Sequence, residues 1–170
     1  MEAALETDQQ TERSVHRSFV QSIYSEDKAL LVGVPTTTLA VGLTAHMSQA
    51  ITLYALTIAM FVVGCSRYLL TRAFQSAESK ADPGQFDYQK WENRYTNIAI
   101  LHTFILGIWF PISVLTGNAF SQFISIALIM GNLIGVCGRN FPLARLVNSQ
   151  IMAVGVPLIG GFIYMGGAYI

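Results

Sequence analysis

Three long stretches of the chain carry no charged side chain. Residues 29–66, 95–138 and 146–170 contain no Asp, Glu, Lys or Arg, and they are 38, 44 and 25 residues long. A helix that rises about 1.5 Å per residue needs about 20 residues to cross roughly 30 Å of hydrocarbon. The first two stretches are therefore long enough for two crossings each, and the third for one.

Turn-forming residues divide the two longer stretches. His46-Met47-Ser48-Gln49 interrupts the first and Thr116-Gly117-Asn118 the second, and Gly, Asn and Ser favour turns. We therefore predict an all-α polytopic bundle of five transmembrane helices, arranged as two hairpins plus one. The predicted transmembrane domain, 29–170, has helices at about 29–46, 50–69, 97–115, 119–137 and 150–170, with a loop at 70–96.

The basic residues predict the orientation. All ten Lys and Arg lie before residue 29, between residues 67 and 94, or at Arg139 and Arg145, and the two short hairpin turns carry none. Because positive charge is retained in the cytoplasm, the N-terminus is expected there. We expect an integral membrane protein, with the lipid bilayer as its first partner.

Composition supports this class of protein. The chain is 52% hydrophobic and 12% charged, whereas soluble domains carry about a quarter charged residues. Ten basic residues balance ten acidic ones, so no net field attracts nucleic acid and we expect no nucleic-acid partner.

The segment before the first crossing, 1–28, is expected to be a cytoplasmic tail. Within it, 11–27 fits either a juxtamembrane helix or a solvated tail. As a helix it would place Val15, Phe19, Ile23 and Tyr24 on one side, along the inner leaflet. Residues 1–10, which are acidic and rich in Gln, are expected to be mobile.

The central cytoplasmic segment predicts a helix that begins before the third crossing. Asp82-Pro83-Gly84 is typical of a turn, and Asp87 is a candidate N-cap. Tyr88, Trp91 and Tyr95 then follow at helical spacing. Their rings suit the interfacial belt, so 87–96 is predicted to extend the third helix into the cytoplasm.

His102 is the one ionisable group predicted inside the membrane. Such a group is a functional candidate by default, either as a proton sensor, as a metal or haem ligand, or as a neutral side chain hydrogen-bonded within the bundle. His46 and His16 are expected too far away to complete a bis-histidine site. We therefore expect no cofactor and no metal.

Two further features concern packing and catalysis. Gly131 and Gly135 form a GxxxG pattern on which helices associate closely, either within one protomer or between protomers. No phosphate-binding loop, metal cluster or acyl-transfer motif is present. The sequence therefore predicts no catalytic residue and no enzymatic activity for this chain.

Several landmarks resemble a known family. They are Trp91-Glu92-Asn93-Arg94-Tyr95, then Leu106-Gly107-Ile108-Trp109, then Gly138-Arg139-Asn140-Phe141, and finally Gln150 at the start of the last helix. Over roughly 17–170 the chain is similar to the multi-pass N-terminal region of bacterial GGDEF and GGDEF-EAL proteins, which make or degrade cyclic di-GMP.

The resemblance implies a membrane anchor and sensor that normally has six helices and precedes a cytoplasmic enzyme. No GGDEF or EAL residues occur here, and a cytoplasmic output domain would need a sixth crossing. We therefore expect a fragment, an isolated membrane portion or a stand-alone relative. The expected structural and signalling landmarks are Trp91, Arg94, His102, Trp109, Arg139 and Asn140.

Three functions follow from the sequence. The favoured one is a sensory or anchoring module of a cyclic di-GMP protein, acting as a homodimer because cyclase activity needs dimerisation. The second is an accessory subunit that packs into a larger membrane complex through its glycine-rich helices. The third is a small transporter, which the lack of intramembrane carboxylates disfavours.

Overall fold

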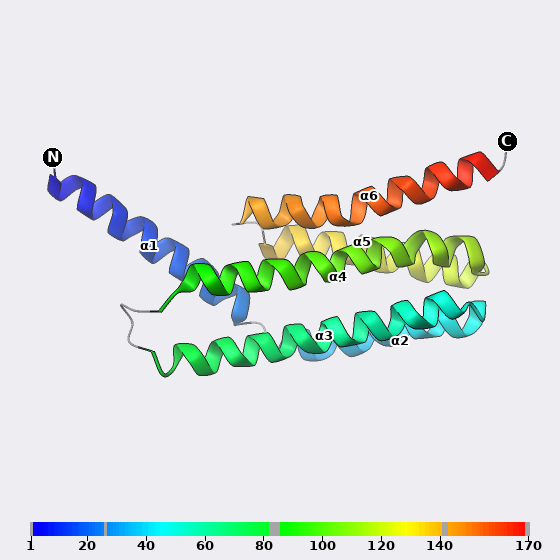
Figure 1. The fold of residues 1–170 in the computed structure, drawn as a ribbon, viewed down its shortest axis with the longest axis horizontal. Helices are drawn as coiled ribbons and strands as arrows, with labels where there is room; N and C mark the ends of the chain where they lie inside the picture. The colour runs from blue at the N-terminus through cyan, green and yellow to red at the C-terminus, as the bar shows by residue number, and fades with distance from the viewer. Residues whose placement is uncertain (1, 26, 82–85, 141–142, 169–170) are drawn as a thin grey trace.

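The chain folds into six helices. The computed structural model describes residues 2–25, 27–81, 86–140 and 143–168. The helices are α1 (Glu2–Tyr24), α2 (Asp27–Ser48), α3 (Ile51–Glu78), α4 (Tyr88–Thr116), α5 (Ala119–Asn140) and α6 (Ala144–Ala168), as Figure 1 shows.

Five of these helices, α2 to α6, are long and apolar enough to cross a membrane, with spans of 19 to 29 residues. The predicted class, an all-α bundle with five membrane-spanning helices, is confirmed. The chain is therefore a helical membrane protein.

The five spanning helices alternate in direction and form the two predicted hairpins. The α2–α3 and α4–α5 turns lie together at one end of the bundle (Figure 1). Gln49, in the first turn, has a φ of 53°. Asn118, in the second, caps α5 by accepting a hydrogen bond from the backbone N–H of Ser121 at 3.0 Å.

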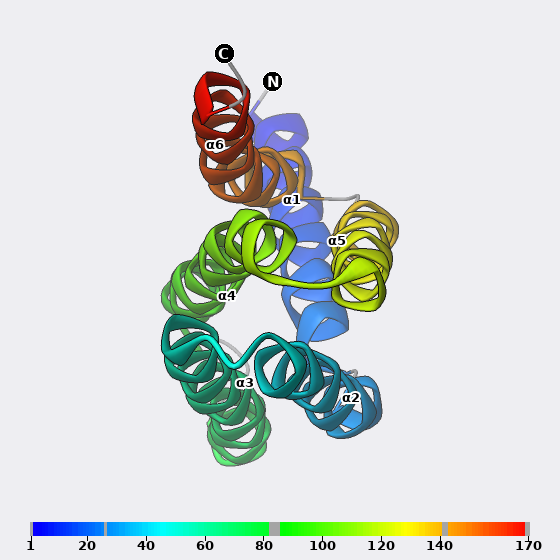
Figure 2. The ribbon, with the colours of Figure 1, turned by 90° about the vertical axis from the view of Figure 1, so that its right-hand side faces the viewer.

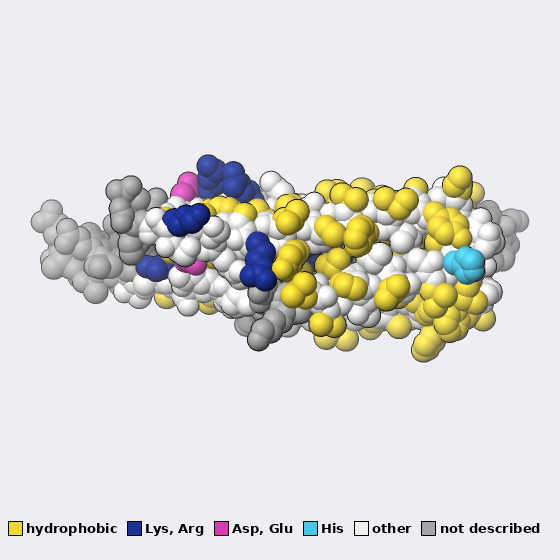
Figure 3. All heavy atoms as spheres, turned by 90° about the horizontal axis from the view of Figure 1, so that it is seen from below, with side chains coloured by type: hydrophobic (Ala, Val, Ile, Leu, Met, Phe, Trp, Pro, Cys, Tyr) yellow, Lys and Arg dark blue, Asp and Glu magenta, His cyan; other side chains and the backbone are white. Residues whose placement is uncertain are grey.

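Charged side chains gather at the other end of the bundle. Figure 3 shows Lys, Arg, Asp and Glu toward the end that carries α1, and hydrophobic side chains over the rest of the visible face. We call this the basic end. It comprises α1, the starts of α2, α4 and α6, and the ends of α3 and α5.

Helix α4 is the centre of the bundle. It contacts each of the other five helices, and Figure 2 shows it between α3 and α6, with α5 beside it. Half of the residues in its most apolar stretch are buried, compared with about a fifth in each of the other four spanning helices. A change in the position of α4 therefore alters its contacts with all five other helices.

The buried centre of α4 combines large side chains with one glycine, Gly107. Trp109 is fully buried, with Leu106 and Phe110 beside it, in a core completed from the neighbouring helices by Val41, Leu53, Met60, Ile129 and Val154. A Cβ added to Gly107 would lie 2.9 Å from the Cα of Val154. The missing side chain therefore lets the backbones of α4 and α6 touch.

Two boundaries of the spanning helices differ clearly from those predicted. Helix α3 continues to Glu78 and α6 begins at Ala144, six residues before the predicted start. The predicted loop 70–96 is therefore helical at both ends. The helical part before residue 97 was expected, whereas the continuation of α3 beyond residue 69 was not. Hydropathy marks the lipid-facing length, whereas a helix continues while its residues, such as Ala, Leu, Arg, Gln and Glu, favour it.

Helix α1 resolves the alternatives for the N-terminal segment. It begins at Glu2, so residues 2–10, which were expected to be mobile, are helical in the structure. Its buried face consists of Val20, Ile23 and Tyr24, while Val15 is 44% exposed. This face packs on α3 and α4, and the position of α1 along the inner leaflet stays a prediction.

Candidate functional site

Two helices are longer than a membrane crossing requires, and their extra length lies at the basic end. Helix α3 has 28 residues and α4 has 29, about 42 Å and 44 Å at 1.5 Å per residue. After about 20 residues for the hydrocarbon, residues 71–78 and 88–96 remain. These two extensions receive α1.

Tyr24 joins α1 to both extensions through its ring. The ring stacks on Phe74 of α3, with centroids 4.0 Å apart and planes at 8°. It meets Trp91 and Tyr95 of α4 edge-on, at 6.2 Å and 5.5 Å. We call these four residues the basic-end junction. Aromatic pairs in such geometries add stability beyond their buried area.

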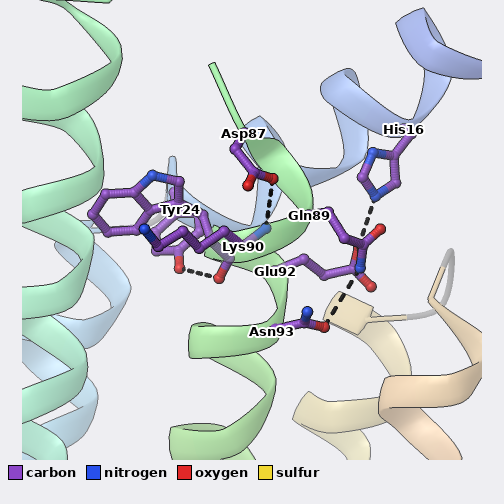
Figure 4. Close-up of polar contacts among 8 residues, drawn as sticks. His16, Tyr24, Asp87, Gln89, Lys90, Glu92 and Asn93 are labelled. Carbon is purple, nitrogen blue, oxygen red and sulfur yellow. Dashed lines mark hydrogen bonds and ion pairs between the residues drawn. The ribbon is translucent and has the colours of Figure 1, made fainter. Parts of the chain in front are cut away.

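Polar bonds fix the position of Tyr24. Its hydroxyl donates to the backbone carbonyl of Trp91 at 2.8 Å (Figure 4). Its own carbonyl accepts from Gln75 Nε2 at 3.2 Å. Burial raises the pKa of the phenol above its ordinary value near 10, an effect that Tyr95 increases and Arg94 opposes. The side chain is 1% exposed, so it stays a neutral donor.

The rim of the junction is polar. His16 on α1 lies 2.6 Å from a carboxylate oxygen of Glu92 on α4 (Figure 4). Gln21 donates to Glu78 of α3 at 2.6 Å, and Tyr88 donates to the same oxygen at 3.0 Å. Figure 4 also shows the predicted N-cap, where Asp87 accepts from the Lys90 N–H at 3.0 Å.

Arg67 connects the junction to the membrane-spanning part of α3. The residue is 8% exposed, and its Nη2 donates to the Tyr95 hydroxyl at 3.2 Å. Its guanidinium carbon also lies 5.6 Å from the centroid of that ring. Burying a cation costs free energy unless it is paired, and Tyr95 supplies a hydrogen bond and a π face.

A second polar group lies on the same side of the bundle. Asn140 of α5 donates to Gln150 of α6 at 2.7 Å, and Gln150 donates to Thr103 of α4 at 3.2 Å. We call these three residues the amide network. Asn140 and Gln150 are 1% and 2% exposed. The network ties the last two helices to α4 at Thr103, which follows the junction residue Tyr95 on the same helix.

The predicted landmarks occupy different parts of this arrangement. Trp91 belongs to the junction, and Arg94 lies over its ring at 5.0 Å. Trp109 is in the core, Asn140 is in the amide network, and His102 lines a cavity between helices. The side chain of Arg139 lies outside the described part of the chain, as does the predicted turn Asp82-Pro83-Gly84.

The GxxxG glycines make no close contact within the protomer. Gly131 and Gly135 are exposed, and a Cβ added to either would have no described heavy atom within 4 Å. The glycines that let helices approach are Gly107 and two others. Gly64 lies against Val34, and Gly161 lies against Pro111.

Sequence reasoning did not select Phe74, Thr103 or Gln150 as site residues, although it placed Gln150 at the start of a helix. One signal was available for Thr103 and Gln150. Both are polar residues within uncharged stretches, where polar side chains are expected to face the bundle interior. Phe74 gave no such signal because apolar residues make up 52% of the chain, and one more does not stand out.

Within the described residues no group of three or more His, Cys, Asp or Glu could hold a metal ion. Cys65 and Cys137 are free thiols. The arrangement is therefore one of packing and hydrogen bonding between helices. Comparisons with protein-family models, with curated proteins and with solved structures gave no match to this chain.

Proposed function

We propose that this chain is a membrane-anchoring and signal-input module of a cyclic di-GMP system in the bacterial inner membrane. The basic end lies in the cytoplasm in this proposal. The observation that carries it is the basic-end junction, where α1 is held on the extensions of α3 and α4 beyond the length needed to cross the bilayer.

Helix α4 is the element that would transmit a signal. It runs without a break from Thr116 to Tyr88 and contains Trp109 of the core, Thr103 of the amide network and Trp91 of the junction. A shift of α4 in the membrane therefore reaches α1 directly. Packed helices change between discrete arrangements, which is how small shifts become large ones in signalling proteins.

The cyclic di-GMP part of the proposal is supported by the resemblance of the landmark residues to the membrane regions of GGDEF proteins. Trp91, Arg94 and Asn140 are among these landmarks, and all three lie at the basic end, where a cytoplasmic partner would make contact. The enzyme itself would be a separate domain or a separate protein that reads the position of α1.

The test is the cellular concentration of cyclic di-GMP when the gene product is made with Tyr24→Ala. This change removes the ring that joins α1 to α3 and α4, so we expect the concentration to move away from the native value. Ser18→Ala is the matched control, because Ser18 is exposed on α1 and its replacement should have no effect.

A third variant separates loss of coupling from loss of protein. Tyr24→Phe keeps the ring contacts and loses only the hydrogen bond of the hydroxyl group. Its cyclic di-GMP concentration should therefore lie between those of the native chain and Tyr24→Ala. Immunoblots of the membrane fraction report how much of each variant is present. Equal cyclic di-GMP in all strains at equal protein levels would contradict the proposed function.

A second candidate function, an accessory subunit of a larger membrane complex, is favoured by the glycine face of α5. Gly131 and Gly135 are exposed and unpacked within the described protomer, and small residues on a lipid-facing surface are typical of helix association. Purification in mild detergent distinguishes the two candidates. Stoichiometric larger subunits would favour the accessory function, and a homodimer would favour the input module.

A further inference from the structure

A cavity opens between α2, α4 and α5 inside the membrane-spanning region. Its volume is about 220 Å³, and its polar lining consists of Thr37, His102 and Asn132, one residue from each helix. The remaining wall is apolar or bare, from Leu106 on α4 and from Ala127, Leu128 and Gly131 on α5.

The cavity lies below the cytoplasmic boundary predicted for the bilayer. Thr37 is seven residues into the span Leu30–Ser48, and Asn132 is six residues from the end of the span Ala119–Gly138. At 1.5 Å per residue, both residues are about 10 Å from the ends of their spans. A ligand would therefore reach the cavity from the hydrocarbon phase and must be soluble in lipid.

Asn132 has an unused hydrogen-bond donor at this site. Its Nδ2 is buried and has no hydrogen-bond partner among the described residues. A buried donor without an acceptor is costly, and in hydrocarbon no bulk water offsets that cost. An acceptor oxygen on a bound molecule would satisfy it. Thr37, on α2, adds a hydroxyl group to the lining of the same cavity.

The cavity lining selects against charge and limits size. His102 is the one ionisable side chain among the residues that line it, and no Asp, Glu, Lys or Arg is among them. With a neutral imidazole, an ionic ligand would have no fixed counter-charge, and burying it would be expensive. A cavity of about 150 Å³ accepts benzene, and drug-sized ligands need about 300 Å³ or more. The volume here lies between these values.

We propose that this cavity binds a neutral, lipid-soluble molecule the size of one substituted ring, whose carbonyl oxygen accepts a hydrogen bond from Asn132. The proposal concerns binding alone and goes beyond the proposed function. It stands or fails independently of whether the chain signals through cyclic di-GMP.

Two glycines one turn apart allow a matched pair of variants. A Cβ added to Gly131 or to Gly135 would have no described heavy atom within 4 Å, so both tolerate a larger side chain. Only Gly131 lines the cavity. Gly131→Leu should therefore obstruct the cavity, while Gly135→Leu changes the same helix equally and leaves the cavity open.

The ligand test uses the full chain in detergent micelles and three probes of similar shape. Acetophenone is neutral and has a carbonyl acceptor. α-Methylstyrene replaces this oxygen with a CH₂ group, and benzoate carries a negative charge. Saturation-transfer NMR gives the dissociation constant of each probe for the native chain, Gly131→Leu, Gly135→Leu and Asn132→Leu.

We expect acetophenone to bind the native chain and Gly135→Leu equally, and to lose binding to Gly131→Leu. Asn132→Leu keeps the size of the side chain but removes the donor. It should therefore raise the dissociation constant of acetophenone about tenfold, the equivalent of one hydrogen bond. It should leave the weaker binding of α-methylstyrene unchanged. Because the Asn132 donor has no partner among the described residues, this variant should unfold at the same temperature as the native chain or higher.

Four results would overturn the proposal. They are equal binding of acetophenone and α-methylstyrene to the native chain, preferential binding of benzoate, acetophenone binding that Gly131→Leu leaves intact, and the absence of acetophenone binding. The unfolding temperatures of the variants, measured in the same micelles, show whether a loss of binding comes from a loss of fold.

Discussion

The close contact of Gly107 on α4 with the backbone of α6 gives a quantitative prediction. A methyl group added by Gly107→Ala would lie 2.9 Å from Val154 Cα, 3.0 Å from Val154 O and 3.2 Å from Ala153 O. All three atoms belong to the backbone of α6, so no side-chain rotation relieves the clash. Carbon atoms pack at about 3.5–4.0 Å, so α4 and α6 must separate by at least about 0.6 Å.

The cost of this separation follows from measurements on overfilled cores. Overpacking of a well-packed interior costs about 1–3 kcal/mol, and the contact between α4 and α6 is the most extensive in the protein. We therefore expect Gly107→Ala to lower the free energy of unfolding by about 1–3 kcal/mol. Replacing a glycine inside a helix would otherwise stabilise it by up to about 1 kcal/mol.

Gly135→Ala is the matched control, because no described heavy atom lies within 4 Å of its added Cβ. It should be neutral or stabilising by up to about 1 kcal/mol. The assay is unfolding in mixed micelles with increasing SDS, followed by the fluorescence of Trp109, which is fully buried. Equal stability of Gly107→Ala and Gly135→Ala would contradict the close contact between the backbones of α4 and α6 at Gly107.

Two further predictions concern the basic end. Asn140→Leu and Gln150→Leu should each destabilise the bundle, by about 1–3 kcal/mol where a buried partner is left unpaired. In the same SDS assay, the double variant should lose less free energy of unfolding than the two single variants lose together. Losses that add exactly would contradict the bond between Asn140 and Gln150. Because the pKa of Tyr24 is raised in the folded state, its contribution to stability is complete below about pH 10 and is lost as the pH rises further. The temperature of thermal unfolding should therefore fall less steeply with pH above about pH 10 in Tyr24→Phe than in the native chain. If the unfolding temperatures of the two proteins fell in parallel, the burial of this phenol would be refuted.

The number of spanning helices and the two hairpin turns could be predicted because lipid imposes them on the sequence. A charge-free stretch of a given length allows only a given number of crossings, and Asn118 and Asp87 act locally on the next residues of their own helices. These features depend on neighbours in the chain, which a sequence displays directly.

The basic-end junction could not be predicted in the same way. Tyr24 meets Phe74 and Trp91 across 50 and 67 residues of sequence, and nothing local indicates that α1 turns back onto the extensions. The face of Tyr88, Trp91 and Tyr95 was correctly placed on one side of a helix. Its interpretation as a lipid-interface belt was wrong for Tyr95, which is 3% exposed beneath α1.

The glycines show the same limit. The GxxxG pattern at Gly131 and Gly135 is visible in the sequence, yet an added Cβ at either glycine would have no described heavy atom within 4 Å. Gly107 carries no such pattern, and only the arrangement of α4 against α6 reveals its close contact with Val154. Whether a small residue packs depends on which helix lies opposite, and this is a property of the fold.

The central claim is that α1 is held against α4 by the basic-end junction. Its most direct test is the distance between spin labels at Ser18 on α1 and Lys90 on α4, both exposed, in a chain whose two cysteines are replaced by alanine. Labels at Ser76 of α3 and Lys90 serve as the control pair. We predict one narrow Ser18–Lys90 distance distribution that broadens in Tyr24→Ala while the control pair is unchanged. A broad distribution in the native chain, or a narrow one that survives Tyr24→Ala, would contradict the claim.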